Sequence, residues 1–326
     1  MITIKIGNSF DLIKELPDKS IDCVMTSPPY WNLRDYNHPD QLGLEKTPEE
    51  YIKKLIDFFD NVKMKLKDTG NLFLNLGDTY SGSKVGNTNG VYADVVDKTK
   101  AYATTSSFKK NKGNLPTKCL CMLPQRFAWN MIECGWILRN EIIWHKKNHM
   151  PESVTDRLTK AHEIVYHFVK QGKYYYNLDA IREPHETQEK RPMGIIRSRE
   201  WGYNGKYEGN KLHEDFGSPR TQRKHEVSQV VASNTNGKNP GDVWSIVTQP
   251  YPESHFATFP LELIRRPILA GCPENGNVLD PFAGSGTVGE FCRKNNRNAI
   301  LFELNPDYKK LIEDRSLSNI VNLCEL

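Results

Sequence analysis

With 326 residues, 38% of them hydrophobic, and a formal net charge of +4, the chain can form one large domain or two modest ones, and nucleic-acid binding would need a local basic face. The seven cysteines are odd in number and scattered, which argues against a disulfide scaffold and predicts a reducing, cytoplasmic location. No apolar run is long enough to span a membrane, and the N-terminus lacks the apolar core of a signal peptide.

The first elements predict a β–α–β unit with parallel strands. Residues 2–6 alternate in polarity and are β-branched, which predicts a strand, and Ser9 can cap a short helix after it. The apolar run 21–25 predicts a second, buried strand. Asn8 follows the first strand and Thr26 the second, so we expect both at the same edge of the sheet, although Asn8 could also be a simple turn residue.

The motif Thr-Ser-Pro-Pro-Tyr-Trp at 26–31 directly follows the buried strand. Its two prolines fix φ and remove two backbone donors, and Ser27 before them is held extended, so the turn is stiff and its carbonyls are free to accept hydrogen bonds. In open α/β sheets ligands bind at such strand ends. A serine, rigid carbonyls and aromatic rings suit a flat, amine-bearing ring. The motif could also be a turn that simply ends a strand.

A helix, a strand and a long loop come next. Thr47 is the expected cap of a helix that reaches about Leu66, and residues 71–76 predict a strand. Asp78 follows that strand and could point into the same cleft or form an ordinary turn. Residues 81–118 are rich in Gly, Ser, Thr, Asn and Lys, which predicts a mobile basic loop that closes over a phosphate backbone or is a solvated insertion.

The middle of the chain changes character. Residues 123–169 predict an amphipathic helix followed by strands. Residues 182–240 have few large aliphatic side chains and interleave arginines with aromatics, which suits a small lobe that contacts an anionic partner or an exposed insertion. Cys119 and Cys121 lack a second ligand pair at zinc spacing, so we expect no metal site.

The last third predicts a second β–α–β unit around Asp-Pro-Phe-Ala-Gly-Ser-Gly-Thr at 280–287. Gly284 and Gly286 allow the backbone to approach a ligand at a helix N-terminus, and Glu303, which ends the next strand, can accept hydrogen bonds from both hydroxyls of a ribose. The spacing is not that of a phosphate-binding loop. A glycine turn used only for close packing is the alternative.

In this order the two motifs are similar to those of S-adenosylmethionine-dependent DNA amino-methyltransferases. The family's catalytic motif is Ser/Asp/Asn-Pro-Pro-Tyr/Phe and its cofactor motif is Asp-Pro-Phe-x-Gly-Ser-Gly-Thr, and the catalytic motif comes first in the permuted β group. Residues 255–260 also resemble the motif that precedes the cofactor turn. The resemblance implies an α/β three-layer sandwich with a mostly parallel, Rossmann-like, circularly permuted sheet and a small irregular target-recognition lobe.

Three regions and two sets of site residues follow from the resemblance. Residues 1–181 would form the N-terminal half of the catalytic domain, 182–240 the target-recognition lobe and 241–326 the cofactor-binding part. The target base and the reaction are assigned to Ser27, Pro28, Pro29 and Tyr30. The residues implied around the cofactor are Asn8, Asp78, Thr258, Phe259, Pro260, Asp280, Phe282, Ala283, Gly284, Ser285, Gly286, Thr287, Glu303 and Asn305.

The implied reaction is methyl transfer from S-adenosylmethionine, without a metal, to the N4 amine of a flipped-out cytosine in duplex DNA. Ser27 resembles cytosine-N4 enzymes, whereas adenine-N6 enzymes commonly have Asp there; adenine-N6 methylation is the alternative, and an RNA amine a less favoured one. A binding-only module is disfavoured by the intact Ser27 and Asp280. We expect double-stranded DNA as partner, a cognate restriction endonuclease acting on the same site, no membrane, and a monomer or homodimer.

Overall fold

The computed structural model describes residues 1–36, 38–82, 114–185, 236–248 and 259–317. The chain divides into two compact units, one formed by Met1–Ile181 with Pro240–Leu326 and the other by Arg182–Asn239. In the second unit, Glu183 and Lys238 form an antiparallel bridge. Most of the loop predicted at 81–118, and most of the lobe to which we assign target recognition, lie outside the described residues.

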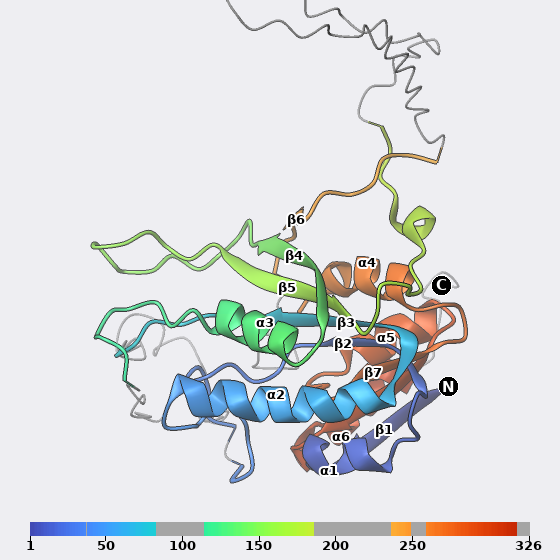
Figure 1. The fold of residues 1–326 in the computed structure, drawn as a ribbon, viewed down its shortest axis with the longest axis horizontal. Helices are drawn as coiled ribbons and strands as arrows, with labels where there is room; N and C mark the ends of the chain where they lie inside the picture. Colours follow the sequence, from blue (N-terminus) through green and yellow to red (C-terminus); the bar gives the residue numbers. More distant parts are fainter. Residues whose placement is uncertain (37, 83–113, 186–235, 249–258, 318–326) are drawn as a thin grey trace, which may run out of the picture. The chain divides into compact units, whose positions relative to one another are not determined.

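An eight-stranded sheet organises the described part of the first unit, in the order β1-β8-β7-β2-β3-β5-β4-β6 (Figure 1). All neighbouring pairs are parallel except those that β5 makes with β3 and β4. The strands are β1 Ile2–Ile6, β2 Ile21–Thr26, β3 Leu66–Leu76, β4 Ile137–His145, β5 His162–Val169, β6 Val243–Ser245, β7 Asn277–Asp280 and β8 Asn298–Glu303. The predicted α/β class with a mostly parallel sheet is confirmed, and the circular permutation stays a prediction.

Helices cover both faces of the sheet. Successive residues of β2 point to opposite faces, so Val24 packs in the core under α1, α2 and α3, while Cys23 and Met25 pack in the core under α4, α5 and α6. This arrangement makes the three layers expected for a sheet that is buried on both faces. The helices are α1 Ser9–Leu12, α2 Pro48–Lys65, α3 Leu123–Glu133, α4 Leu261–Gly271, α5 Thr287–Lys294 and α6 Lys309–Leu317. No helix among the described residues is long and apolar enough to cross a membrane.

The helix predicted after Thr47 forms with the expected cap. The Thr47 side chain accepts a hydrogen bond from Glu50 N at 3.2 Å, and Pro48 occupies the first turn. The strand that follows begins earlier than predicted, because β3 starts at Leu66, directly after the helix, rather than at residue 71. The buried Leu66 pairs with Ile21 of β2, and the register shifts before the next pair, Cys23 with Asn71, so Gly70, which local sequence marks as a break, lies in an irregular part of the strand.

The strand directions bring five segment ends to one edge of the sheet. The carboxyl ends of β1, β2, β3, β7 and β8 lie at this edge because these strands run parallel. Strand β4 runs the same way, since it is antiparallel to β5, and its carboxyl end at His145 pairs with His162 at the amino end of β5. The edge therefore also receives residues 146 and 163, which are not neighbours of either motif in the sequence.

Candidate active site

A cleft of about 880 Å³ opens at this edge of the sheet. Its volume lies in the range of small-molecule and cofactor sites, roughly 300–1,000 Å³. Both motifs contribute to its wall. The lining residues that the sequence predicted are Asn8, Ser27, Pro28, Pro29, Tyr30, Phe259, Phe282, Ala283, Gly284, Ser285, Thr287, Glu303 and Asn305.

A fully buried hydrogen bond joins the two motifs. Thr26 Oγ1 donates to Asp280 Oδ1 at 2.7 Å, and Phe282 N donates to the same oxygen at 3.2 Å. The Ser9 hydroxyl donates to the carbonyl of Pro281 and ties the start of α1 to the same turn. The ends of β1, β2 and β7 are thus held in one arrangement around the cleft.

Asp280 is a buried carboxyl group with one unsatisfied oxygen. Its Oδ2 atom has no hydrogen-bond partner among the described residues. Burial, together with a smaller effect of the charge of Glu303, raises the pKa of Asp280 from its usual value near 3.8 to about 7. The hydrogen bond from Thr26 lowers that pKa without offsetting the burial. Asp280 lies beneath the turn and does not line the cleft itself.

Glu303 ends β8 and lines the cleft, as the sequence predicts for a group that binds hydroxyls. Gly284 N donates to its Oε2 at 2.8 Å and Asn305 N to its Oε1 at 2.9 Å. Burial raises the pKa of Glu303 to about 7, against the effect of these backbone donors. Each carboxylate oxygen has a second lone pair, so the group can still accept from a ligand.

The two glycines of the turn serve different purposes. Gly284 has φ 53°, lines the cleft, and has open space where a Cβ would stand, so its backbone is accessible to a ligand. Gly286 has φ 81°, but a Cβ there would lie 2.8 Å from Ser316 Oγ of α6. Close packing therefore explains Gly286, whereas Gly284 leaves room for a ligand.

Ser27 and Tyr30 share a polar network with Asn75 of β3. Ser27 Oγ lies 3.2 Å from Tyr30 Oη and 3.4 Å from Asn75 Oδ1, and Tyr30 Oη donates to Asn75 Oδ1 at 2.9 Å. A Cβ on Gly77 would lie 2.4 Å from the Tyr30 ring, so this glycine makes room for the ring. The prediction that the carbonyls of this turn are free to accept hydrogen bonds is wrong for Pro29, whose carbonyl accepts from Tyr51 Oη at 2.8 Å.

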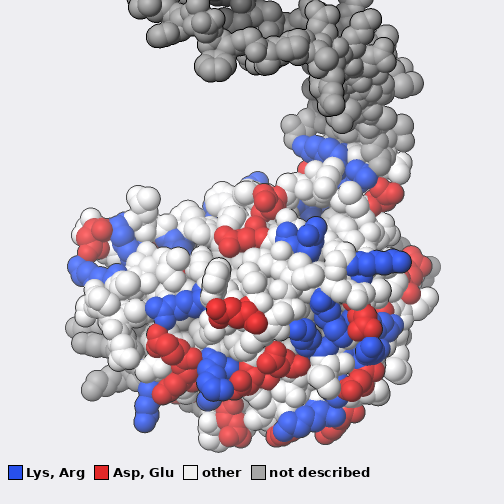
Figure 2. Space-filling view, in the orientation of Figure 1, with Lys and Arg blue, Asp and Glu red and all other residues white. Residues whose placement is uncertain are grey.

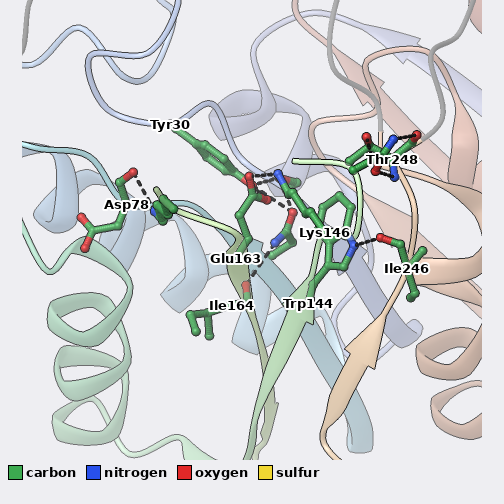
Figure 3. Close-up of polar contacts among 12 residues, drawn as sticks. Tyr30, Asp78, Trp144, Lys146, Glu163, Ile164, Ile246 and Thr248 are labelled. Carbon is green, nitrogen blue, oxygen red and sulfur yellow. Dashed lines mark hydrogen bonds and ion pairs between the residues drawn. The ribbon is translucent and has the colours of Figure 1, made fainter. Parts of the chain in front are cut away.

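Glu163 and Lys146 belong to this network and were missed by the sequence reasoning. Glu163 Oε2 also lies 2.9 Å from Tyr30 Oη, so the single proton of this hydroxyl can be donated either to Asn75 or to Glu163, and Lys146 Nζ donates to Glu163 Oε1. Figure 3 shows the three side chains pointing toward one another from three different segments. Both residues line the cleft. A sequence signal existed, since a carboxylate opens the apolar strand β5, but its partners are remote in sequence.

Asp78 is placed elsewhere. Its carboxylate accepts hydrogen bonds from Met122 N at 3.0 Å and Leu123 N at 3.1 Å, at the start of α3, and it does not line the cleft. Pro260 caps α4 and does not line the cleft either. Thr258 lies outside the described residues. The described residues contain no group of three or more side chains that could hold a metal ion.

Comparison with known proteins identifies a family. A profile of the DNA methylase family matches residues 21–314. The chain is 37% identical to the Type II methyltransferase M.SmaI of Serratia marcescens, over 96% of this chain and 90% of that protein.

Two solved structures share the fold. The cytosine-N4-specific PvuII DNA methyltransferase superposes with a TM-score of 0.62 at 19% identity, over 98% of this chain and 88% of that one. A DNA modification methylase from Thermus thermophilus, complexed with S-adenosyl-L-methionine, superposes with a TM-score of 0.55 at 22% identity, over 97% and 93% of the two chains.

The raised pKa values make stability depend on pH. Asp280 and Glu303 each have a folded-state pKa of about 7, so they keep protons that the unfolded chain releases near pH 4. The stability that these two groups contribute is therefore complete below pH 4 and is lost as the pH rises through 7. We expect Asp280→Asn, which is uncharged at every pH, to flatten this loss and to stabilise the ligand-free protein by roughly 1–4 kcal/mol at pH 8 and little at pH 4.

Calorimetric melting between pH 4 and pH 8 checks this expectation. Asp57→Asn, on the exposed face of α2, is the matched control and should run parallel to the unmodified protein. An Asp280→Asn profile that is also parallel would show that the buried carboxyl does not titrate in this range.

Proposed function

Because this chain belongs to the DNA methylase family, we propose that it transfers the methyl group of S-adenosylmethionine to the N4 amine of a cytosine in duplex DNA. The family membership makes it a DNA methyltransferase of the type that modifies exocyclic amines. The observation that supports N4 is Ser27, a neutral side chain at the first position of the motif, which lies in the cleft beside Tyr30. The PvuII enzyme, which is described as cytosine-N4-specific, has the same fold.

The residues of the cleft fit S-adenosylmethionine. Glu303 has lone pairs left to accept from two ribose hydroxyls, and Gly284 exposes backbone where a side chain would intrude. Asp280 keeps an unsatisfied carboxyl oxygen beneath the turn, and this oxygen would serve the methionine end of the cofactor, which carries an amino group. Bound there, the cofactor supplies an electrophilic methyl group. Asn8 and Phe282 complete the wall of this half of the cleft.

The other half of the cleft holds the groups that would act on the amine. The lone pair of an aromatic amine is delocalised into the ring, which makes the nitrogen a weak nucleophile. Ser27 Oγ and the carbonyl of Pro28 would accept hydrogen bonds from the amine and direct its lone pair toward the methyl group, so that positioning lowers much of the barrier. The Tyr30 ring, held by Gly77 and by its hydroxyl, would support the flat face of the base.

Duplex DNA is the proposed partner because the matching family and the named relatives are DNA methyltransferases. Basic side chains of two loops, Arg34, Lys146 and Lys160, line the cleft and could contact phosphates, although acidic side chains line it as well. Basic and acidic side chains are also interspersed on the described surface that Figure 2 shows. A base inside a duplex cannot reach Ser27, so it would be flipped out, at a cost of a few kcal/mol.

The wider biological setting extends this proposal. The relatives with known names are Type II methyltransferases, which supports a role in restriction and modification beside an endonuclease that cuts the same site. The lobe at 182–240 would read the DNA sequence.

Analysis of the methylated product tests the proposed function. The purified protein is incubated with labelled S-adenosylmethionine and long duplex DNA, and the DNA is then digested to nucleosides. We expect mass spectrometry of these nucleosides to detect N4-methylcytosine. The same amount of structured RNA should receive no label. N6-methyladenine as the product would reject the cytosine assignment, and label in RNA alone would reject DNA as the substrate.

Substitution of Ser27 tests its role in the reaction. Because Ser27 would contact the amine and not the cofactor, Ser27→Ala should lower the single-turnover rate of methyl transfer by about 100-fold. The cofactor dissociation constant, measured by calorimetry, should change less than twofold. An unchanged single-turnover rate would remove Ser27 from the mechanism.

A further inference from the structure

We propose that Glu163 receives the proton that the methylated amine must lose, and that this proton travels from Ser27 through the hydroxyl of Tyr30. The inference rests on the proposed function and deepens it, because methyl transfer leaves the amine with a surplus proton and a positive charge. Neither sequence motif contains a carboxylate that contacts Ser27 or Tyr30. Glu163, from outside the motifs, has a carboxylate that contacts Tyr30.

The hydrogen bonds form a continuous line with the right polarity. Ser27 Oγ donates to Tyr30 Oη at 3.2 Å, and Tyr30 Oη donates to Glu163 Oε2 at 2.9 Å. Each hydroxyl in the line can accept one proton while it gives up another, which is what a proton relay requires. The line begins at the serine proposed to contact the amine and ends at an acceptor.

Asn75 competes for the same hydroxyl protons but is the weaker acceptor. Its Oδ1 lies 2.9 Å from Tyr30 Oη and 3.4 Å from Ser27 Oγ. Its Nδ2 donates to the carbonyl of Ile164 at 3.1 Å, which fixes the amide with its oxygen toward the two hydroxyls. A neutral amide oxygen cannot take a proton at neutral pH, and hydrogen bonds to an ionised carboxylate are stronger. Asn75 therefore orients the hydroxyls, and Glu163 accepts the proton.

Lys146 holds the Glu163 side chain in place. Its Nζ donates to Glu163 Oε1, the oxygen that Tyr30 does not use. Lys146 also stands 4.5 Å from the centre of the Trp144 ring, and Trp144 Nε1 donates to the carbonyl of Ile246 at 3.0 Å. This packing holds the ammonium group beside Glu163 and leaves the other carboxylate oxygen facing Tyr30.

The position of Glu163 also gives the proton a way out. Its side chain is 15% exposed and lines the cleft, and that of Lys146 is 22% exposed. Tyr30, in contrast, is a relay and not an end point, because burial raises the pKa of its phenol well above the usual value and the charge of Glu163 raises it further. The phenol passes a proton on without remaining ionised.

The step balances as follows. The amine nitrogen forms its bond to the methyl carbon while the C–S bond breaks and leaves its electron pair on sulfur. The nitrogen then loses a proton to Ser27 Oγ, the Ser27 proton moves to Tyr30 Oη, and the Tyr30 proton moves to Glu163 Oε2. The products are a neutral methylated amine and a neutral carboxylic acid at Glu163, which releases its proton to water in the cleft.

The negative charge at the end of the line should also speed methyl transfer. Hydrogen bonds in a chain polarise one another, so Glu163 makes Ser27 a better acceptor at the moment when positive charge develops on the amine. Glu163 does not touch the substrate and is a positioning residue by this account. Its removal should affect the rate and leave the binding of cofactor and DNA intact.

A double-mutant cycle tests the relay. Glu163→Gln keeps the size and an acceptor oxygen but cannot take a proton, and Tyr30→Phe removes the middle hydroxyl. We expect each to lower the single-turnover rate about 10- to 100-fold with cofactor and DNA dissociation constants within twofold. The double variant should be no slower than the slower single variant, because both changes break one line. Glu163→Asp, which keeps a carboxylate, should recover part of the rate.

A solvent isotope effect adds a readout that a structural role would not move. Rates in heavy water should fall for the unmodified protein, and Glu163→Gln should diminish that effect. Asp68→Asn is the matched control, since it removes a carboxylate from β3 that pairs with Lys19 and Lys170 outside the cleft, and it should match the unmodified protein.

Several outcomes would overturn the relay. One is an unchanged rate in Glu163→Gln, and another is the multiplication of the two single losses in the double variant. Lost binding or a melting temperature lowered well beyond that of Asp68→Asn would reduce Glu163 to a structural role. Failure of the unmodified protein to methylate DNA would instead contradict the proposed function, so the two failures are distinguishable.

Discussion

The hydrogen bond from Thr26 to Asp280 is the contact on which the site depends. It joins residues 254 positions apart in the sequence, at the ends of the adjacent strands β2 and β7, and it is fully buried. Each residue directly precedes the first position of its motif turn, Ser27 on one side and Pro281 on the other. The bond therefore fixes the distance between the half of the cleft that fits the cofactor and the half that holds Ser27. This arrangement keeps the Asp280 carboxyl group away from water, and that burial raises its pKa to about 7.

The reversed direction of β5 supplies what the parallel strands do not. In the parallel part of the sheet only carboxyl ends reach the cleft, and they bring turns and their backbone groups. Because β5 runs the other way, its second residue, Glu163, reaches the same edge, opposite Trp144 of β4 and beside Lys146. The ion pair thus closes the β4–β5 hairpin at the point where Tyr30 needs a partner.

The sequence predicts features whose cause is local. Thr47 caps its helix because Pro48 and the Glu50 N–H donor follow within three residues. Glu303 could be placed at the end of β8 because the glycine turn, the helix and the strand follow one another directly in the sequence. Features that depend on remote partners were not predictable. The donors that draw Asp78 away from the cleft lie 44 and 45 positions further along the chain, and the helix that packs on Gly286 is the last one described. Glu163 could not be recognised as a site residue because the side chain that it contacts, Tyr30, lies 133 positions away in the sequence.

The substitution Thr26→Val tests most directly whether one buried bond sets the geometry of a single shared site. Because valine has the same shape but no hydroxyl, we expect Thr26→Val to weaken cofactor binding and to lower the single-turnover rate at saturating cofactor, each by about tenfold, which corresponds to a lost buried hydrogen bond of roughly 1–3 kcal/mol. Thr47→Val, which removes only a helix cap, should cost about 1 kcal/mol of stability and change neither quantity. Equal cofactor affinity and equal rate in Thr26→Val and the unmodified protein would contradict this account.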